Sequence, residues 1–281
     1  KAYLERAKCY FEIKKYTEAE QDFSNVLALN SENINVYYYK GLSNLKQGKL
    51  KTALKELTLY THIHKEDADA FYYKGVAEFQ LQLYQEALSS YSKVLDIDNR
   101  YAYAYNDRGS VKRQLGDIEG AILDYGLAIK YAPKEAFVYN NLGSSYRVNK
   151  DYDQAIVAYR KALELEESHM FYNNLGQVYM EKKDFQEAID CFSKALELYP
   201  AFTAGLNNRG NAYVKQGAYE TAMQDYDKAL KLDKHFGVVY LNKGIAYEKM
   251  KKLDLACQNY QIASGLGVKL AETYYKQVCN E

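Results

Sequence analysis

A small residue recurs through this chain at a nearly constant interval. Seven glycines and one alanine are spaced 34 residues apart, with a single interval of 33, at Ala7, Gly41, Gly75, Gly109, Gly143, Gly176, Gly210 and Gly244. An alanine follows each of these small residues after twelve positions, at Ala19, Ala53, Ala87, Ala121, Ala155, Ala188, Ala222 and Ala256. A strict period of this length indicates one supersecondary unit that is used eight times.

The two small-residue columns predict that each unit is a pair of closely crossing helices. Helices that approach at short range need side chains of small volume at the crossing, so a glycine on one helix is expected to meet an alanine on the other. Both prolines, Pro133 and Pro200, stand 24 residues after a column glycine. Proline cannot continue a helix, so the second helix of a unit is expected to end there.

The columns of aromatic, Gly, Tyr, Ala, aromatic, Ala and Pro residues resemble the tetratricopeptide-repeat consensus, most fully in residues 138–167 and 206–233. The resemblance implies an all-α fold, a right-handed superhelical solenoid of eight helix-turn-helix repeats with a concave groove lined by the first helices. The predicted repeats are residues 1–33, 34–67, 68–101, 102–135, 136–168, 169–202, 203–236 and 237–267. Apolar residues at helical spacing then predict a C-terminal capping helix in residues 268–281.

The charge balance argues against nucleic acid as a partner. Lysine plus arginine and aspartate plus glutamate each number 37, so the chain has no net charge with which to attract a polyanion. No apolar run is long enough to cross a bilayer, which argues against membrane insertion by this segment. The expected partner is therefore another protein or a peptide segment, and the oligomeric state stays open.

No catalytic or metal-binding pattern stands out. Gly265-Leu266-Gly267 follows a predicted helix and lacks the third glycine of a phosphate loop, so it is interpreted as a helix end. The four histidines do not predict a metal site, because His169 and His235 lie in units far from His62 and His64. We expect no enzyme activity, no cofactor and no metal.

Two columns of asparagine are the leading candidates for a binding site. They lie two and three residues before the column glycine, at Asn141, Asn174, Asn208 and Asn242 and at Asn106, Asn140, Asn173 and Asn207. A primary amide can donate and accept, so it can pair with a peptide main chain of any sequence. The columns resemble the asparagine ladder in the repeat arm of O-GlcNAc transferase, which implies a grip on extended peptide. The alternative is that these are solvated residues of the repeat consensus.

Aromatic and basic residues extend the candidate groove. Its aromatic members are Tyr38, Tyr39, Tyr72, Tyr73 and Phe79, which would form a binding patch if exposed or a packing surface if another helix covers them. Arg113 and Arg147 lie in neighbouring units and could face one acidic group on a ligand. Pairing with a local carboxylate such as Asp107 is the alternative.

The C-terminal cysteines resemble the closing segment of certain bacterial cell-envelope repeat proteins. That resemblance implies a candidate disulfide between Cys257 and Cys279. A disulfide would indicate an oxidising compartment such as the periplasm of a bacterial cell envelope, whereas the cytoplasm is the default without one. The localisation is therefore unknown at this point.

The predicted function is a non-catalytic scaffold or adaptor that binds an extended peptide segment in the concave groove. One alternative is a structural subunit of a larger multiprotein assembly. Another is the substrate-recruiting arm of a longer enzyme.

Overall fold

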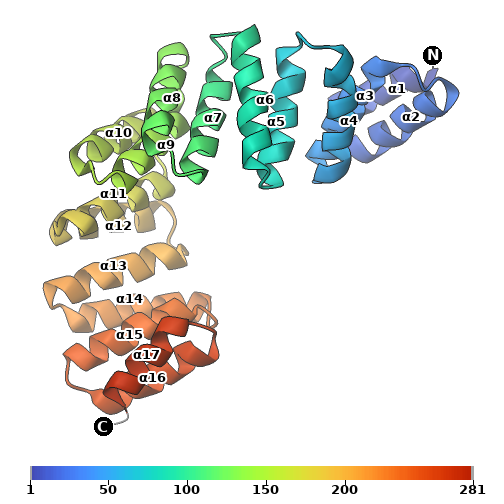
Figure 1. The fold of residues 1–281 in the computed structure, drawn as a ribbon. Coiled ribbons are helices and arrows are strands. Elements are labelled where there is room, and N and C mark those ends of the chain that lie inside the picture. Colours follow the sequence, from blue (N-terminus) through green and yellow to red (C-terminus); the bar gives the residue numbers. More distant parts are fainter. Residues whose placement is uncertain (1, 280–281) are drawn as a thin grey trace. The chain divides into compact units, whose positions relative to one another are not determined.

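The computed structural model describes residues 2–279, and helices joined by short turns are the only regular secondary structure in them (Figure 1). The helices are α1 (Ala2–Glu12), α2 (Tyr16–Leu29), α3 (Ile34–Lys46), α4 (Leu50–Ile63), α5 (Ala68–Gln80), α6 (Tyr84–Ile97), α7 (Ala102–Gln114), α8 (Ile118–Tyr131), α9 (Ala136–Val148), α10 (Tyr152–Leu165), α11 (His169–Lys182), α12 (Phe185–Leu198), α13 (Thr203–Gln216), α14 (Tyr219–Leu232), α15 (Gly237–Lys249), α16 (Leu253–Gly265) and α17 (Lys269–Val278). The prediction of an all-α helical-repeat fold is confirmed. Residue 1 of the first predicted repeat and residues 280–281 of the predicted cap lie outside the described residues.

Contacts divide the chain into two compact units, Lys1–Ser145 and Tyr146–Glu281, with the boundary inside α9. In the first unit the hairpins α1–α2, α3–α4, α5–α6 and α7–α8 follow one another, and the first part of α9 packs on α8. In the second unit α10 packs on α11, the hairpins α11–α12, α13–α14 and α15–α16 follow, and α17 packs on α16. Within each unit, the first helices of neighbouring hairpins contact one another. We call the surface they line the first-helix face.

Six hairpins, α3–α4, α5–α6, α7–α8, α11–α12, α13–α14 and α15–α16, close through an aromatic or leucine side chain of the second helix that lies over the column glycine of the first. A Cβ atom on Gly176 would lie 2.6 Å from Phe192 Cε1, and one on Gly210 would lie 2.6 Å from Tyr226 Cε1. Both rings are fully buried. The glycine is needed because the ring occupies the space that a methyl group would take.

The turn inside each hairpin uses a residue with left-handed backbone. Three of the hairpins have glycine there, Gly48, Gly116 and Gly217. The other five have Lys14, Gln82, Lys150, Lys183 and Lys251 at the corresponding position, with φ between 59 and 67°. A non-glycine residue pays about 1–2 kcal/mol in this region, so the tertiary contacts of the hairpin impose the turn rather than the local sequence.

A buried ion pair joins the two helices of several hairpins. This pair was not predicted from the sequence. Arg108 bonds Asp124 at 2.8 Å and Arg209 bonds Asp225 at 2.8 Å, and each aspartate side chain is only 3% exposed. Arg209 also donates to Ser193 Oγ of the preceding hairpin at 3.0 Å. The pair therefore stabilises both a hairpin and its contact with its neighbour.

Two repeats replace this ion pair with apolar residues. Leu142 and Ala158 stand at the corresponding positions of the fifth repeat, and Leu175 and Cys191 at those of the sixth. In these two repeats the acid and the base are both absent, so neither repeat buries one charge of the pair without the other.

The C-terminal helix α17 covers the last hairpin. Ala271 is fully buried, and Tyr274, Tyr275 and Val278 pack on the cluster around Tyr260 of α16. A disulfide joins Cys257 of α16 to Cys279, whose Cα atoms are 5.8 Å apart. None of the helices in residues 2–279 is long and apolar enough to cross a membrane.

Two glycine substitutions test the role of the ring contact. We expect Gly176→Ala to destabilise the protein by about 1–3 kcal/mol, because the new methyl group must displace the buried Phe192 ring. We expect Gly126→Ala to stabilise it by about 0.5–1 kcal/mol, because Gly126 is exposed in α8 with nothing within 4 Å of the added atom. Urea unfolding measures both; effects of the same sign would contradict this account.

A double-mutant cycle tests the ion pair. Arg209→Leu leaves Asp225 buried without its counter-charge and should lower the free energy of unfolding by about 3–5 kcal/mol. Adding Asp225→Ala reproduces the composition of the fifth repeat and should recover part of that loss. If the double variant is as unstable as the sum of the two single variants, the coupling between the pair is absent.

Candidate functional site

Asparagine side chains connect neighbouring repeats along the first-helix face. In the second unit Asn208 Nδ2 donates to Asn173 Oδ1 at 2.9 Å, and Asn242 Nδ2 donates to Asn207 Oδ1 at 2.8 Å. In the first unit Asn141 Nδ2 donates to Asn106 Oδ1 at 3.0 Å. We call Asn106, Asn140, Asn173 and Asn207 the inner asparagines and Asn141, Asn174, Asn208 and Asn242 the outer asparagines. Each of these bonds runs from an outer asparagine to an inner asparagine of the preceding repeat.

The two columns have different environments. Asn106, Asn173 and Asn207 are 5%, 7% and 6% exposed, whereas all four outer asparagines are half-buried. Burial of an amide without partners is costly, so the described bonds satisfy groups that water does not reach. The inner asparagines at these three positions therefore hold repeats together, and the outer column is the one that borders the solvent.

The outer asparagine Asn208 keeps hydrogen-bonding capacity for a ligand. A primary amide has two N–H donors and a carbonyl oxygen with two lone pairs. Asn208 uses one donor toward Asn173 and one lone pair to accept from Asn207 Nδ2 at 3.3 Å. Its remaining donor and lone pair can serve a ligand without breaking the link between repeats.

Asp107 takes the outer position in the fourth repeat and makes the same kind of link with different chemistry. Its carboxylate accepts from Tyr72 Oη of the preceding repeat at 2.8 Å and from Asn106 Nδ2 at 2.9 Å. Burial raises the pKa of Asp107 above its ordinary value, while these two hydrogen bonds lower it less strongly. The site is therefore one where a negative charge is costly.

The predicted aromatic residues form a connected group across α3 and α5, which we call the tyrosine cluster: Tyr38, Tyr39, Tyr72 and Tyr73. Ring centroids are 5.3 Å apart for Tyr38 and Tyr39, and 5.4 Å apart for Tyr72 and Tyr73. Tyr38 and Tyr73 connect the two repeats at 6.5 Å. All four side chains are half-buried, so part of each remains exposed while the rest is packed.

The remaining predicted residues have mainly local partners. Phe79 packs edge-on against Tyr84 of its own hairpin, at 5.7 Å between centroids. Arg147 Nη1 donates to Glu181 at 2.8 Å, which is the local pairing named above as the alternative to an acidic ligand. Arg113 is half-buried, and its Nε atom has no hydrogen-bond partner among the described residues. A common acidic ligand for the two arginines stays a prediction.

A small pocket opens on the first-helix face of the second unit. It has a volume of about 210 Å³ and is lined by Arg147, Gln177, Met180, Glu181, Phe192, Asn208 and Asn211. Gln177, Met180, Glu181 and Asn211 were not predicted from the sequence. Their positions relative to the column glycine were available in the sequence, but these positions differ so much between repeats that no column marked them.

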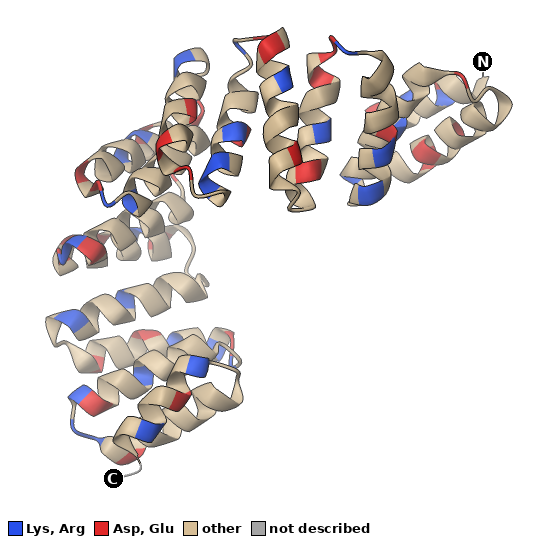
Figure 2. Ribbon diagram, in the orientation of Figure 1, with Lys and Arg blue, Asp and Glu red and all other residues tan. Residues whose placement is uncertain are grey.

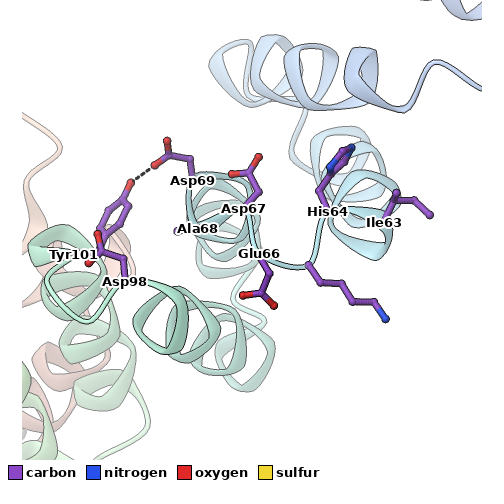
Figure 3. A pocket seen from close by; sticks show the side chains of 9 residues that line it. Ile63, His64, Glu66, Asp67, Ala68, Asp69, Asp98 and Tyr101 are labelled. Carbon is purple, nitrogen blue, oxygen red and sulfur yellow. Dashed lines mark hydrogen bonds between the residues drawn. The ribbon is translucent and has the colours of Figure 1, made fainter.

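A larger hollow lies in the first unit, where α4 leads into α5 and α6 leads into α7 (Figure 3). It has a volume of about 790 Å³ and is lined by Ile63, His64, Lys65, Glu66, Asp67, Ala68, Asp69, Asp98 and Tyr101. We call it the α4–α5 hollow.

Acidic and basic residues are interspersed along the helices of each unit (Figure 2). Within residues 2–279, no group of three His, Cys, Asp or Glu side chains is placed to hold a metal ion.

Comparison with family models finds the tetratricopeptide repeat along most of the sequence. The matched segments are residues 1–33, 40–102, 102–135, 136–169, 170–202 and 204–236. No curated protein sequence matches the chain.

Solved structures share the fold at low sequence identity. A chain of the APC/C hetero-tetramer Cut9–Hcn1 aligns with 99% of this chain at a TM-score of 0.68 and 21% identity, and this chain spans 55% of that one. A tetratricopeptide repeat protein from Parabacteroides merdae aligns with 88% of this chain at a TM-score of 0.71 and 18% identity, over 99% of its own length. YrrB, a protein with an unusual peptide-binding site, aligns with 66% of this chain at a TM-score of 0.52 and 19% identity, over 97% of its own length.

The pH dependence of stability tests the burial of Asp107. Because the pKa is raised in the folded state, folding favours the protonated acid, so the unfolding free energy should fall as pH rises from the ordinary aspartate value through the raised one. Asp107→Asn keeps the shape, and its amide can still bond Tyr72 and Asn106. The variant should match the wild type near pH 4 and be more stable near pH 7.

Urea unfolding across this pH range provides the measurement, and Asp96→Asn provides the control. Asp96 is an exposed acid in α6 of the same unit. A difference between Asp107→Asn and wild type that does not change with pH would show that Asp107 has no raised pKa.

Proposed function

Because the chain belongs to the tetratricopeptide-repeat family, whose fold supports protein-interaction scaffolds, we propose that it is a non-catalytic adaptor that binds an extended peptide segment of a partner on its first-helix face. The outer asparagines would hold the main chain of that segment. On the first unit the tyrosine cluster would contact side chains of a bound segment, and on the second unit the pocket beside Arg147 would do so. YrrB, which has a peptide-binding site, provides a precedent for peptide binding by this fold.

The observation that carries this proposal is the hydrogen bonding of the outer asparagines. Each described bond from an outer to an inner asparagine fixes the orientation of the outer amide before any ligand arrives. A side chain that is already ordered loses little rotamer entropy on binding, so little of the binding free energy of each contact is offset by that cost. One amide per repeat, facing one surface, suits a ligand that runs across successive repeats.

The family precedent and the side-chain geometry favour a segment held by its main chain. Main-chain groups of an extended peptide are the same whatever its sequence, and amides can pair with both the N–H and the C=O group. Side-chain selection then falls to the aromatic rings of the first unit and to the apolar floor of the pocket, formed by Phe192 and Met180.

A structural subunit is the second candidate, and exposed apolar side chains on the second helices favour it. Leu29 at the end of α2 is 77% exposed and Leu123 of α8 is 70% exposed. Scattered apolar residues of this kind are common on protein surfaces, so they favour this candidate less strongly than the asparagine geometry favours the first. In that case the partner would be lost when second-helix residues are changed and kept when the outer asparagines are changed.

Changing Asn141, Asn174 and Asn208 together to Ala tests the proposed function. We expect the partner that the wild type captures from native extract, identified by mass spectrometry, to be reduced by at least tenfold, since three main-chain contacts of about 1 kcal/mol each are removed. The matched control changes Gln154, Gln224 and Gln258 to Ala, which removes three exposed amides from second helices.

Stability must be separated from binding in this experiment. The triple variant also removes bonds to buried inner asparagines, so capture is measured well below its unfolding temperature. Arg209→Leu serves as a second control that is destabilised but keeps all outer asparagines. Unchanged capture by the triple variant, or equal loss in the Arg209→Leu variant, would contradict binding on the first-helix face.

A further inference from the structure

Asp69 occupies an unusual position between the tyrosine cluster and the α4–α5 hollow. It lies in the first turn of α5, three and four residues before Tyr72 and Tyr73, so the three side chains share one side of the helix. Its carboxylate is exposed, and its Oδ1 atom accepts from Tyr101 Oη at 2.8 Å (Figure 3). Burial raises the pKa of Tyr38 and of Tyr73, and the nearby charge of Asp69 raises both further. The carboxylate is therefore close to three phenol rings.

The other acidic side chains of the hollow have hydrogen-bond or ion-pair partners within the protein. Glu66 pairs with Lys93 at 3.2 Å. Asp67 caps α5 by accepting from the Ala70 amide at 3.0 Å, and it also accepts from Tyr60 Oη at 2.8 Å. Asp98 accepts from the Arg100 amide at 2.9 Å.

Asp69 differs from Glu66 because it is in no described ion pair, and from Asp67 and Asp98 because it accepts no described backbone amide; its described hydrogen bond comes from Tyr101 of the next repeat. No ion pair described within residues 2–279 includes Asp69. The basic groups that line the hollow are His64 and Lys65, and neither is paired with Asp69. An exposed carboxylate on the proposed binding surface is thus left without a counter-charge.

The aromatic rings beside Asp69 add to its attraction for a cation. Tyr72 and Tyr101 stack with centroids 5.2 Å apart, and Tyr38 and Tyr73 are 6.5 Å apart. The face of a tyrosine ring carries negative potential and attracts cations, and this attraction adds to that of a carboxylate. A planar guanidinium fits this combination best, since it can stack on a ring and donate to a carboxylate at the same time.

We propose that Asp69, together with Tyr38, Tyr73 and Tyr101, forms a binding site for an arginine side chain of the partner segment. This inference rests on the proposed function, because it assigns one side chain to the segment that the first-helix face would hold.

A purely structural role for Asp69 makes a different prediction. An acid in the first turn stabilises a helix by its interaction with the helix dipole, with no ligand involved. Asp69→Asn would then change stability and leave ligand preference unchanged. The matched control is Glu86→Gln, which removes an exposed first-turn acid from α6 in the same unit.

The experiment compares three synthetic peptides that alternate glycine and serine and differ in one central residue: arginine, its neutral isostere citrulline, or lysine. Binding is followed by NMR of isotope-labelled tyrosine rings in the full chain. We expect the arginine peptide to bind about five- to thirtyfold more tightly than the citrulline peptide, with the lysine peptide between them. Asp69→Asn should reduce that preference to less than about twofold, and Glu86→Gln should retain it.

Several results would overturn the arginine site. Equal affinity for the arginine and citrulline peptides would do so, as would the absence of any tyrosine shift. A preference for arginine that survives Asp69→Asn would also do so. An affinity difference between these peptides does not measure the main-chain contacts. The asparagine triple variant tests those contacts separately, by partner capture. A preference for lysine over arginine would show that a point charge, and not a stacked guanidinium, is recognised, and would also overturn the proposal.

Discussion

The contact between a column glycine and the large side chain above it is the constraint on which the rest of the structure depends. Where Phe192 lies over Gly176, the ring occupies the space of a Cβ atom, which would lie only 2.6 Å from Phe192 Cε1. This approach sets the separation and the crossing of the two helices in a hairpin. The positions of all other side chains, including those of the first-helix face, follow from that packing.

Polar contacts then add order to a core that is built by apolar packing. The pair between Arg209 and Asp225 acts within a hairpin, and its bond to Ser193 reaches the preceding one. The hydrogen bonds between asparagines instead join the first helices of successive repeats. Because each link joins only neighbours, a repeat can change its chemistry, as the fourth does with Asp107, without disturbing distant repeats.

The sequence contained the asparagine columns of the proposed site, but it did not show that the two columns have different environments. The two asparagine columns were treated alike because both stand beside the column glycine. In the structure Asn106, Asn173 and Asn207 are buried and accept from the next repeat, whereas Asn208 keeps groups for a ligand. One residue along a helix turns the side chain by 100°, and the position of the neighbouring repeat decides which of the two is covered. Asp69 was not noticed at all, because its significance depends on Tyr38 and Tyr101, which come from other repeats.

The sequence by itself determined the repeat, its eight occurrences, the helix pair in each and the residues at the crossings, because these depend on spacing and side-chain volume within one repeat. Only the tertiary structure decided which polar residues face the solvent and which are used between repeats. It also revealed the buried ion pairs and the hollow beside Asp69. These features depend on distances between side chains from different helices, and the periodicity of a single chain does not contain those distances.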